Sequence, residues 1–228
     1  AYEIVSRDWS SDVCSSDLGL RAVVVTGEWG PLDGARPSSV PVMPLAVWLA
    51  NGRASGHLSG PRADDLAAIV YTSGTTGRPK AGMLTHGQLA FVVTNHLADL
   101  IPGTRETDCS IAVAPLSHGA GIHALLNVAR GAATVLLPSE RMDPAEVWRL
   151  IEQHRVSNLF TVPTIVKLLV EHPAVDQHDH SSLRHVIYAG APMYRADQKL
   201  ALQKLGPVLV QYFGLGEVTG DRKSTRLN

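Results

Sequence analysis

Short apolar runs alternate with helical stretches along most of the chain. The apolar runs predict strands at residues 21–26, 67–71, 110–114, 134–137, 158–162, 185–189 and 208–212. The stretches between them predict helices at residues 86–97, 119–129, 143–154, 164–171 and 195–205. One helix start is well marked, because Asp143 can cap the helix and Pro144 suits its first position. This alternation predicts an α/β fold, a mainly parallel sheet flanked by helices.

The two ends of the chain differ from its middle. Residues 8–18 nearly repeat the triplet Ser-Ser-Asp and offer almost nothing to bury, and residues 221–228 are polar and basic. Both strings resemble translated sequencing-adapter read-through. We therefore predict adapter-like, non-native tails at residues 1–18 and 221–228, around a partial domain at residues 19–220 that is cut at both sides.

Composition narrows the function classes. Hydrophobic residues make up 45% of the 228 residues, enough for a sizeable core. The net charge is -1, so the chain lacks the basic excess of nucleic-acid-binding proteins. The longest uncharged run, residues 109–129, contains glycines and polar groups that lipid would leave unpaired, so we expect no transmembrane segment. Two cysteines form no disulfide framework, which favours a cytoplasmic location.

Residues 71–80 carry the clearest chemistry. They read Y-T-S-G-T-T-G-R-P-K and lie between a predicted buried strand and a predicted helix. Glycines let backbone N–H groups approach an anion, hydroxyls add donors, and Lys80 adds a positive charge. The hydroxyls and glycines of this segment are Thr72, Ser73, Gly74, Thr75, Thr76 and Gly77. The pattern predicts a phosphate-binding loop, although not of the G-x-x-x-x-G-K-[ST] type.

Residues 71–86 together resemble the signature phosphate loop of the adenylate-forming (AMP-binding) superfamily. This superfamily includes acyl-CoA synthetases, luciferases and peptide-synthetase adenylation domains. The segment departs from the usual pattern at Ala81 and Gly82, and neither change removes a phosphate donor. Four further segments resemble motifs in the family's order: APLSH at 114–118, FTVPTIVKLL at 160–169, YAGAPM at 188–193 and FGLGE at 213–217. The fold so implied is part of the large N-terminal domain of an adenylate-forming enzyme.

The resemblance also implies roles for the matched residues. Lys80 and the loop would bind the phosphates of ATP, His118 would lie at the acyl-carboxylate region, and Glu217 would serve Mg²⁺. These three residues would be the catalytic ones. The residues implied along the nucleotide base are Gly190, Ala191, Pro192, Phe213 and Gly214. Gly216 stands where the family usually has threonine, so one phosphate-facing hydroxyl is missing.

The implied function is that of an ATP-dependent ligase that joins a carboxylic acid, a fatty acid in our prediction, to coenzyme A through an acyl-AMP intermediate. The implied small molecules are the acid, ATP, Mg²⁺ and CoA. A peptide-synthetase adenylation domain and a non-catalytic nucleotide-binding remnant are the alternatives. Family members carry a catalytic lysine on a C-terminal domain that the chain does not match. We therefore expect the fragment alone to be inactive or nearly so.

The tail assignment gives a testable prediction. If residues 8–18 are not native sequence, nothing has selected them to pack, so their amides should exchange rapidly with solvent. A chain starting near Gly19 should then be at least as stable as the 228-residue chain. Hydrogen exchange tests this, and strong amide protection across residues 10–17 would contradict it.

Overall fold

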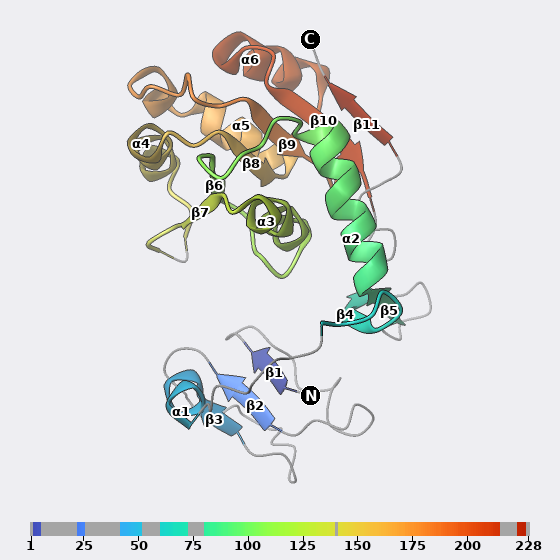
Figure 1. Cartoon of the computed structure of the whole chain (residues 1–228). Coiled ribbons are helices and arrows are strands. Elements are labelled where there is room, and N and C mark those ends of the chain that lie inside the picture. Colours follow the sequence, from blue (N-terminus) through green and yellow to red (C-terminus); the bar gives the residue numbers. More distant parts are fainter. Residues whose placement is uncertain are drawn as a thin grey trace. The chain divides into compact units, whose positions relative to one another are not determined.

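The computed structural model (Figure 1) describes residues 2–5, 22–25, 42–51, 60–72, 80–139, 141–214 and 223–226. The chain divides into two compact units, Ala1–Gly60 and Pro61–Asn228. The first unit holds three parallel strands in the order β1 (Tyr2–Val5), β2 (Ala22–Val25) and β3 (Val42–Pro44), followed by helix α1 (Leu45–Asn51). Strand β2 confirms the strand predicted at residues 21–26. The serine-rich stretch at 8–18 lies outside the described residues.

The second unit opens with a two-stranded antiparallel ribbon, β4 (Leu66–Thr72) and β5 (Lys80–Thr85). Two expectations about this region are wrong. The segment after β4 leads into a second strand rather than into a helix, and the strand predicted as buried at 67–71 is half-buried at residues 67–70 and exposed at Tyr71. The helix, α2 (His86–Asn95), begins only after β5, at a capping box in which Thr85 and Gln88 bond each other's backbone N–H. A one-turn π-helix, η1 (His96–Leu100), extends it.

A mainly parallel sheet forms the body of the second unit. Its strand order is β11-β10-β9-β8-β6-β7, and only β11 runs antiparallel to its neighbour. The strands are β6 (Cys109–Ala112), β7 (Ala133–Leu136), β8 (Asn158–Thr161), β9 (His185–Tyr188), β10 (Leu209–Phe213) and β11 (Lys223–Arg226). The helices between them are α3 (Gly119–Arg130), α4 (Pro144–His154), α5 (Pro163–Glu171) with the 3₁₀ turn η2 (Pro173–Asp176), and α6 (Arg195–Leu205). The predicted α/β class is thus confirmed. The predicted tails at 1–18 and 221–228 contain β1, which pairs with β2, and β11, which pairs with β10.

Helices cover both faces of this sheet (Figure 1). In β8, Leu159 packs into the cluster formed with α4, α5 and α6, and the next residue, Phe160, packs into the cluster formed with η1 and α3. This strand is buried along its whole length, which explains why its sequence reads as a nearly continuous apolar run. The predicted helix start is also confirmed, since Asp143 accepts a hydrogen bond from the N–H of Ala145.

Within the described part of the chain, no helix combines the length and the apolar character that crossing a bilayer requires.

A buried polar network joins α3 to β8. Nε2 of His123 lies 2.8 Å from Oδ1 of Asn158. The Asn158 amide donates through Nδ2 to Oδ1 of Asn127 at 3.2 Å, and the Asn127 amide donates to the backbone oxygen of His123. Since Oδ1 of Asn158 can only accept, Nε2 of His123 carries the proton and donates it. Burial, reinforced by the neighbouring His96 and His185, lowers the pKa of His123 to about 4 despite this bond.

This histidine makes stability depend on pH. The pKa of His123 falls from 6.5 to about 4 on folding, so protons favour the unfolded chain. Stability should be complete above pH 6.5 and should decline as the pH falls toward 4, by about 3 kcal/mol at about 1.4 kcal/mol per pKa unit. Urea unfolding across this range measures the loss.

The variant His123→Gln should flatten the decline, and His154→Gln, on the exposed end of α4, should leave it unchanged. An equally steep decline in His123→Gln would show that other groups control acid stability.

Candidate active site

The predicted site residues in the loops of the main sheet gather at one edge of that sheet. Parallel strands end at the same edge, and the residues that follow β6, β9 and β10 include His118, Gly190 and Gly214. In sheets of this type, ligands bind outside the carboxyl ends of the strands, where successive connections run to opposite sides. Here that point lies between β6 and β8, because β7 lies beyond β6 and β9 lies beyond β8. The topology therefore identifies the same edge as the motifs do.

His118 lies where the loop after β6 turns into α3. Its N–H donates to the Pro115 oxygen at 3.1 Å, and its own oxygen accepts from the N–H of Gly121 at 2.9 Å. It is the N-cap residue of α3, and its exposed imidazole has Nδ1 2.9 Å from Oγ of Ser117. The helix N-terminus adds a positive partial charge and free backbone N–H groups beside the imidazole. This arrangement suits a carboxylate held next to His118.

The turn after β9 presents an open backbone surface. Gly190 has a φ of 85°, a conformation that side chains disfavour, and Ala191 and Pro192 after it are exposed. The turn is anchored on both sides, by the N–H of Ala189 donating to the Thr161 oxygen and by the buried Met193. A flat ligand can lie along such a turn without displacing a side chain.

Strand β10 ends in two aromatic residues that face opposite sides. Tyr212 is buried against the α3 side of the sheet, and the next residue, Phe213, leaves 53% of its surface exposed. A large exposed aromatic side chain at a ligand-binding edge offers a stacking surface for a base. Gly214 follows it and is half-buried. The turn at Gly190 and the ring of Phe213 thus fit the adenine contacts that the motifs imply.

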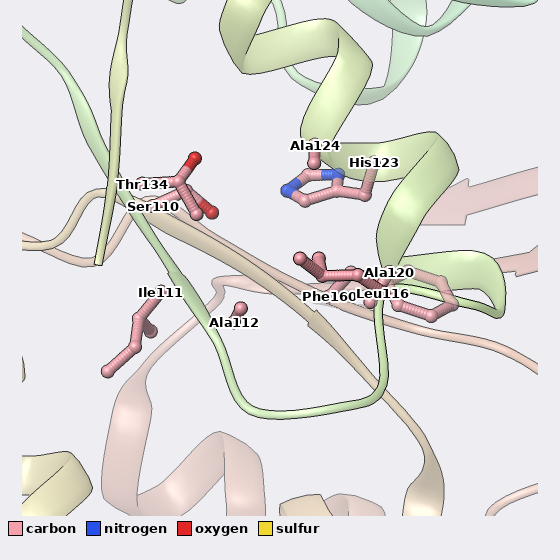
Figure 2. Close-up of a pocket in the computed structure, with 9 residues that line it drawn as sticks. All are labelled: Ser110, Ile111, Ala112, Leu116, Ala120, His123, Ala124, Thr134 and Phe160. Carbon is pink, nitrogen blue, oxygen red and sulfur yellow. The ribbon is translucent and has the colours of Figure 1, made fainter. Parts of the chain in front are cut away.

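A small cavity lies between α3 and the strands β6, β7 and β8. Figure 2 shows the His123 ring and Ala124 from α3 on one side, and Ser110 and Thr134 from the strands on another. Its remaining lining residues are Ile111, Ala112, Leu116, Ala120 and Phe160. Its volume of about 10 Å³ is close to the smallest that can hold one water molecule. In this conformation the cavity admits no acyl group.

The sequence of the chain decides its family. The profile of the family described as AMP-binding enzyme matches residues 21–225. The chain belongs to this family. The resemblance drawn from the five motifs is therefore confirmed.

Relatives of this AMP-binding enzyme domain include ligases that use CoA. It is 38% identical over 156 residues to a feruloyl-CoA synthase of Amycolatopsis sp, covering 68% of this chain and 31% of that protein. It is 35% identical over 175 residues to 4-coumarate–CoA ligase 5 of Oryza sativa subsp. japonica, covering 74% of this chain and 32% of that protein. The chain therefore spans about a third of the length of the curated relatives it matches.

Solved structures agree with the fold. The N-terminal domain of FACL13 from Mycobacterium tuberculosis, solved with an inhibitor bound, matches with a TM-score of 0.78 and 26% identity over 91% of this chain and 54% of that one. ATP-bound MatB from Rhodopseudomonas palustris matches with a TM-score of 0.71 and 25% identity, over 82% of this chain and 38% of that one. The prediction of a partial N-terminal domain of an adenylate-forming enzyme is confirmed as to fold.

The phosphate loop of this AMP-binding enzyme domain is described only at its two ends. Thr72 and Lys80 pair across the ribbon as the last residue of β4 and the first of β5. The rest of the loop, Ser73, Gly74, Thr75, Thr76 and Gly77, lies outside the described residues, as does Glu217. The ribbon brings the hydroxyl-rich end of β4 back to the lysine, so both belong to one hairpin. Their roles stay predictions.

Sequence reasoning missed the groups that support the site. It assigned no role to His123, Asn127 or Asn158, although His123 and Asn127 are four residues apart in an otherwise apolar helix. That spacing places two polar side chains on one helix face, a usable signal for a buried hydrogen-bonded pair. It also gave Phe160 no role beyond its motif, because no pattern in one strand shows which helix residue its ring will meet.

Proposed function

We propose that this chain belongs to an ATP-dependent ligase that activates a carboxylic acid as acyl-AMP and passes the acyl group to coenzyme A. The observation that carries the proposal is the grouping of His118, the turn at Gly190 and the exposed Phe213 at one edge of the sheet. A carboxylate and a nucleotide must meet for adenylation, and this edge offers surfaces for both.

Different residues of the chain contact the base, the acid and the phosphates. Phe213 and the backbone at Gly190–Pro192 hold the base, and His118 with the N-terminus of α3 orients the acid. The hairpin loop carries the hydroxyls and glycines from Thr72 to Gly77, which with Lys80 contact the phosphates. The reaction joins a carboxylate oxygen to the α-phosphorus and expels pyrophosphate, so cationic groups and N–H donors must already point at the phosphates.

The Mg²⁺ ion would offset phosphate charge, and Glu217 is the residue we propose to hold it. Magnesium takes one or two carboxylates together with phosphate oxygens, so a single glutamate fits this chemistry. Among the described residues, no group of three or more His, Cys, Asp or Glu side chains could hold a metal ion. We propose that Glu217 and the phosphate oxygens of the nucleotide hold the ion together.

The names of the relatives support our proposals for the acid substrate and for the thiol that accepts the acyl group. Feruloyl-CoA synthase, 4-coumarate–CoA ligase and a medium/long-chain-fatty-acid–CoA ligase, FadD8 of Mycobacterium tuberculosis (31% identical over 156 residues), all name CoA products of carboxylic acids. This supports CoA over the carrier-bound thiol of a peptide synthetase. A fatty acid stays our prediction for the acid, and the first two names add aryl acids as the second candidate. A cytoplasmic location belongs to the same proposal.

The proposal is tested by acid-dependent ATP–pyrophosphate exchange in a full-length enzyme that carries this domain. We expect exchange with short, long or aryl carboxylic acids, followed by an acyl-CoA product when CoA is added. If none of the acids in the panel supports exchange, the proposal is overturned. Acyl transfer only to a carrier-protein thiol would favour the peptide-synthetase alternative.

The 228-residue chain alone should bind ATP weakly and release pyrophosphate at a small fraction of that enzyme's rate. About two thirds of the relatives' length lies outside the matched region, and we expect the elements that exclude water and complete the charge-stabilising set to come from there. Pyrophosphate release with ATP, Mg²⁺ and the acid panel measures this. Acid-dependent release near the full-length rate would contradict the expectation.

Lys80 offers a direct test of the phosphate loop. In a full-length enzyme that carries this domain, Lys80→Ala should lower kcat on the order of a hundredfold, about 3 kcal/mol. The reason is that the lost cationic contact stabilises the transition state more than it stabilises bound ATP. The matched control is Lys199→Ala, on the exposed side of α6, which should leave kcat unchanged. Steady-state kinetics measure both, and unchanged turnover in Lys80→Ala would remove Lys80 from the mechanism.

A further inference from the structure

The first turn of α3 is packed unusually closely at two glycines. A β-carbon on Gly119 would lie 2.6 Å from Cζ of Phe160, at the tip of its ring. A β-carbon on Gly121 would lie 2.0 Å from the backbone oxygen of Leu116. Both distances are shorter than real contacts allow, so both positions require glycine as the structure stands. The two obstacles differ, because one is a side chain and the other is backbone.

The ring of Phe160 contacts two other rings and also lines the small cavity described above. Phe160 is 7% exposed. The centroid distance is 6.1 Å to the ring of His123 and 5.7 Å to that of Tyr212. Tyr212 in turn lies 5.3 Å from the ring of His96 in η1. Because packed neighbours resist displacement of the ring, its tip limits how closely α3 can approach.

His118 immediately precedes Gly119, so the same contact fixes its backbone. The oxygen of His118 is bonded to the N–H of Gly121 within the turn that rests on Phe160. An alanine at position 119 would have to move by roughly 1 Å to reach ordinary contact with the ring. His118 would move with it. A misplacement of about 1 Å at a reacting group can cost on the order of a hundredfold in rate.

We propose that Phe160 is a positioning residue, whose ring sets how closely the N-terminus of α3, and with it His118, approaches the carboxyl end of β8. This inference rests on the proposed function in so far as His118 orients the acid. It concerns Phe160 and Gly119 as a matched pair, in which the missing β-carbon of one makes room for the ring of the other. Figure 2 shows Phe160 beside Ala120 and below the His123 ring.

If Gly119 and Phe160 act as a matched pair, Phe160→Leu should rescue the effect of Gly119→Ala on the KM for the acid. In a full-length enzyme that carries this domain, Gly119→Ala should raise KM for the acid about tenfold or more, whereas KM for ATP should change less than about twofold. Adding Phe160→Leu removes the ring tip that the new methyl group meets, so the double variant should return to within about threefold of Phe160→Leu alone. A merely structural defect would raise both KM values or lower the melting temperature without such a split.

The matched control uses the second glycine. Gly121→Ala meets backbone rather than the Phe160 ring, so Phe160→Leu should not rescue it. Equal rescue of the two alanine variants would show that Phe160→Leu relaxes the region in general, and would overturn the proposal. An acid KM in Gly119→Ala equal to that of the unchanged enzyme would overturn it as well.

A second measurement separates this inference from the proposed function. In the 228-residue chain, the ¹³C–¹H NMR signals of the His118 ring should shift in Gly119→Ala, and in the double variant they should match those of Phe160→Leu alone. If they do so while no acid supports exchange in the full-length enzyme, the positioning stands and the proposed function is wrong. If the His118 signals do not respond, the positioning role is wrong whatever the activity. Should Gly119→Ala fail to fold, Phe160→Leu alone should still shift the signals, and unshifted signals would overturn the proposal.

Discussion

The parallel sheet of the second unit has to bury both of its faces, and the site depends on this requirement. Parallel strands need a crossover connection between neighbours, and in this chain the crossovers are helices lying on either face. Successive residues Leu159 and Phe160 therefore pack into two different cores. The same geometry brings the carboxyl ends of all the parallel strands to one edge. Loops far apart in the sequence meet there without any direct interaction having to draw them together.

On the α3 side, the sheet and the helix are held by two kinds of contact. Two hydrogen bonds, one donated by His123 to Asn158 and one donated by Asn158 to Asn127, fix the register of α3 over β8. Close packing of Gly119 on Phe160 fixes the distance at the helix N-terminus. Displacing the partner of a buried polar group costs free energy, and so does displacing a packed ring. The two contacts therefore restrict different motions of α3. Together they restrict the position of the His118 backbone at the N-terminus of α3.

The phosphate loop follows a different plan from the rest of the site. It connects two antiparallel strands, β4 and β5, and not a strand and a helix of the main sheet. A hairpin brings its two ends together, which is why Thr72 and Lys80 are cross-strand partners although eight positions separate them. The chain thus combines a hairpin with a strand-edge site. We propose that ATP is held between these two parts, by its phosphates at the hairpin and by its base at the turn and Phe213.

The order and type of most elements could be predicted from the sequence, because apolar runs buried on both faces and a capped helix such as that at Asp143 leave local signals. The motif order was sufficient to predict the family and to single out His118, Gly190 and Phe213, whereas the edge at which they lie came from the strand order. Strand β5 was missed, since K-A-G-M-L-T has no pattern that separates a ribbon strand from the start of a helix.

Only the tertiary structure decided the partnership of His123 with Asn158 and of Gly119 with Phe160. Each joins residues at least 35 positions apart, and neither member alone shows which side chain it will meet. Local sequence determines which face of an element is apolar, because that depends on the spacing of its own residues. Which side chain lies opposite a given residue depends on how two elements dock, and docking is settled by the packing of the whole core.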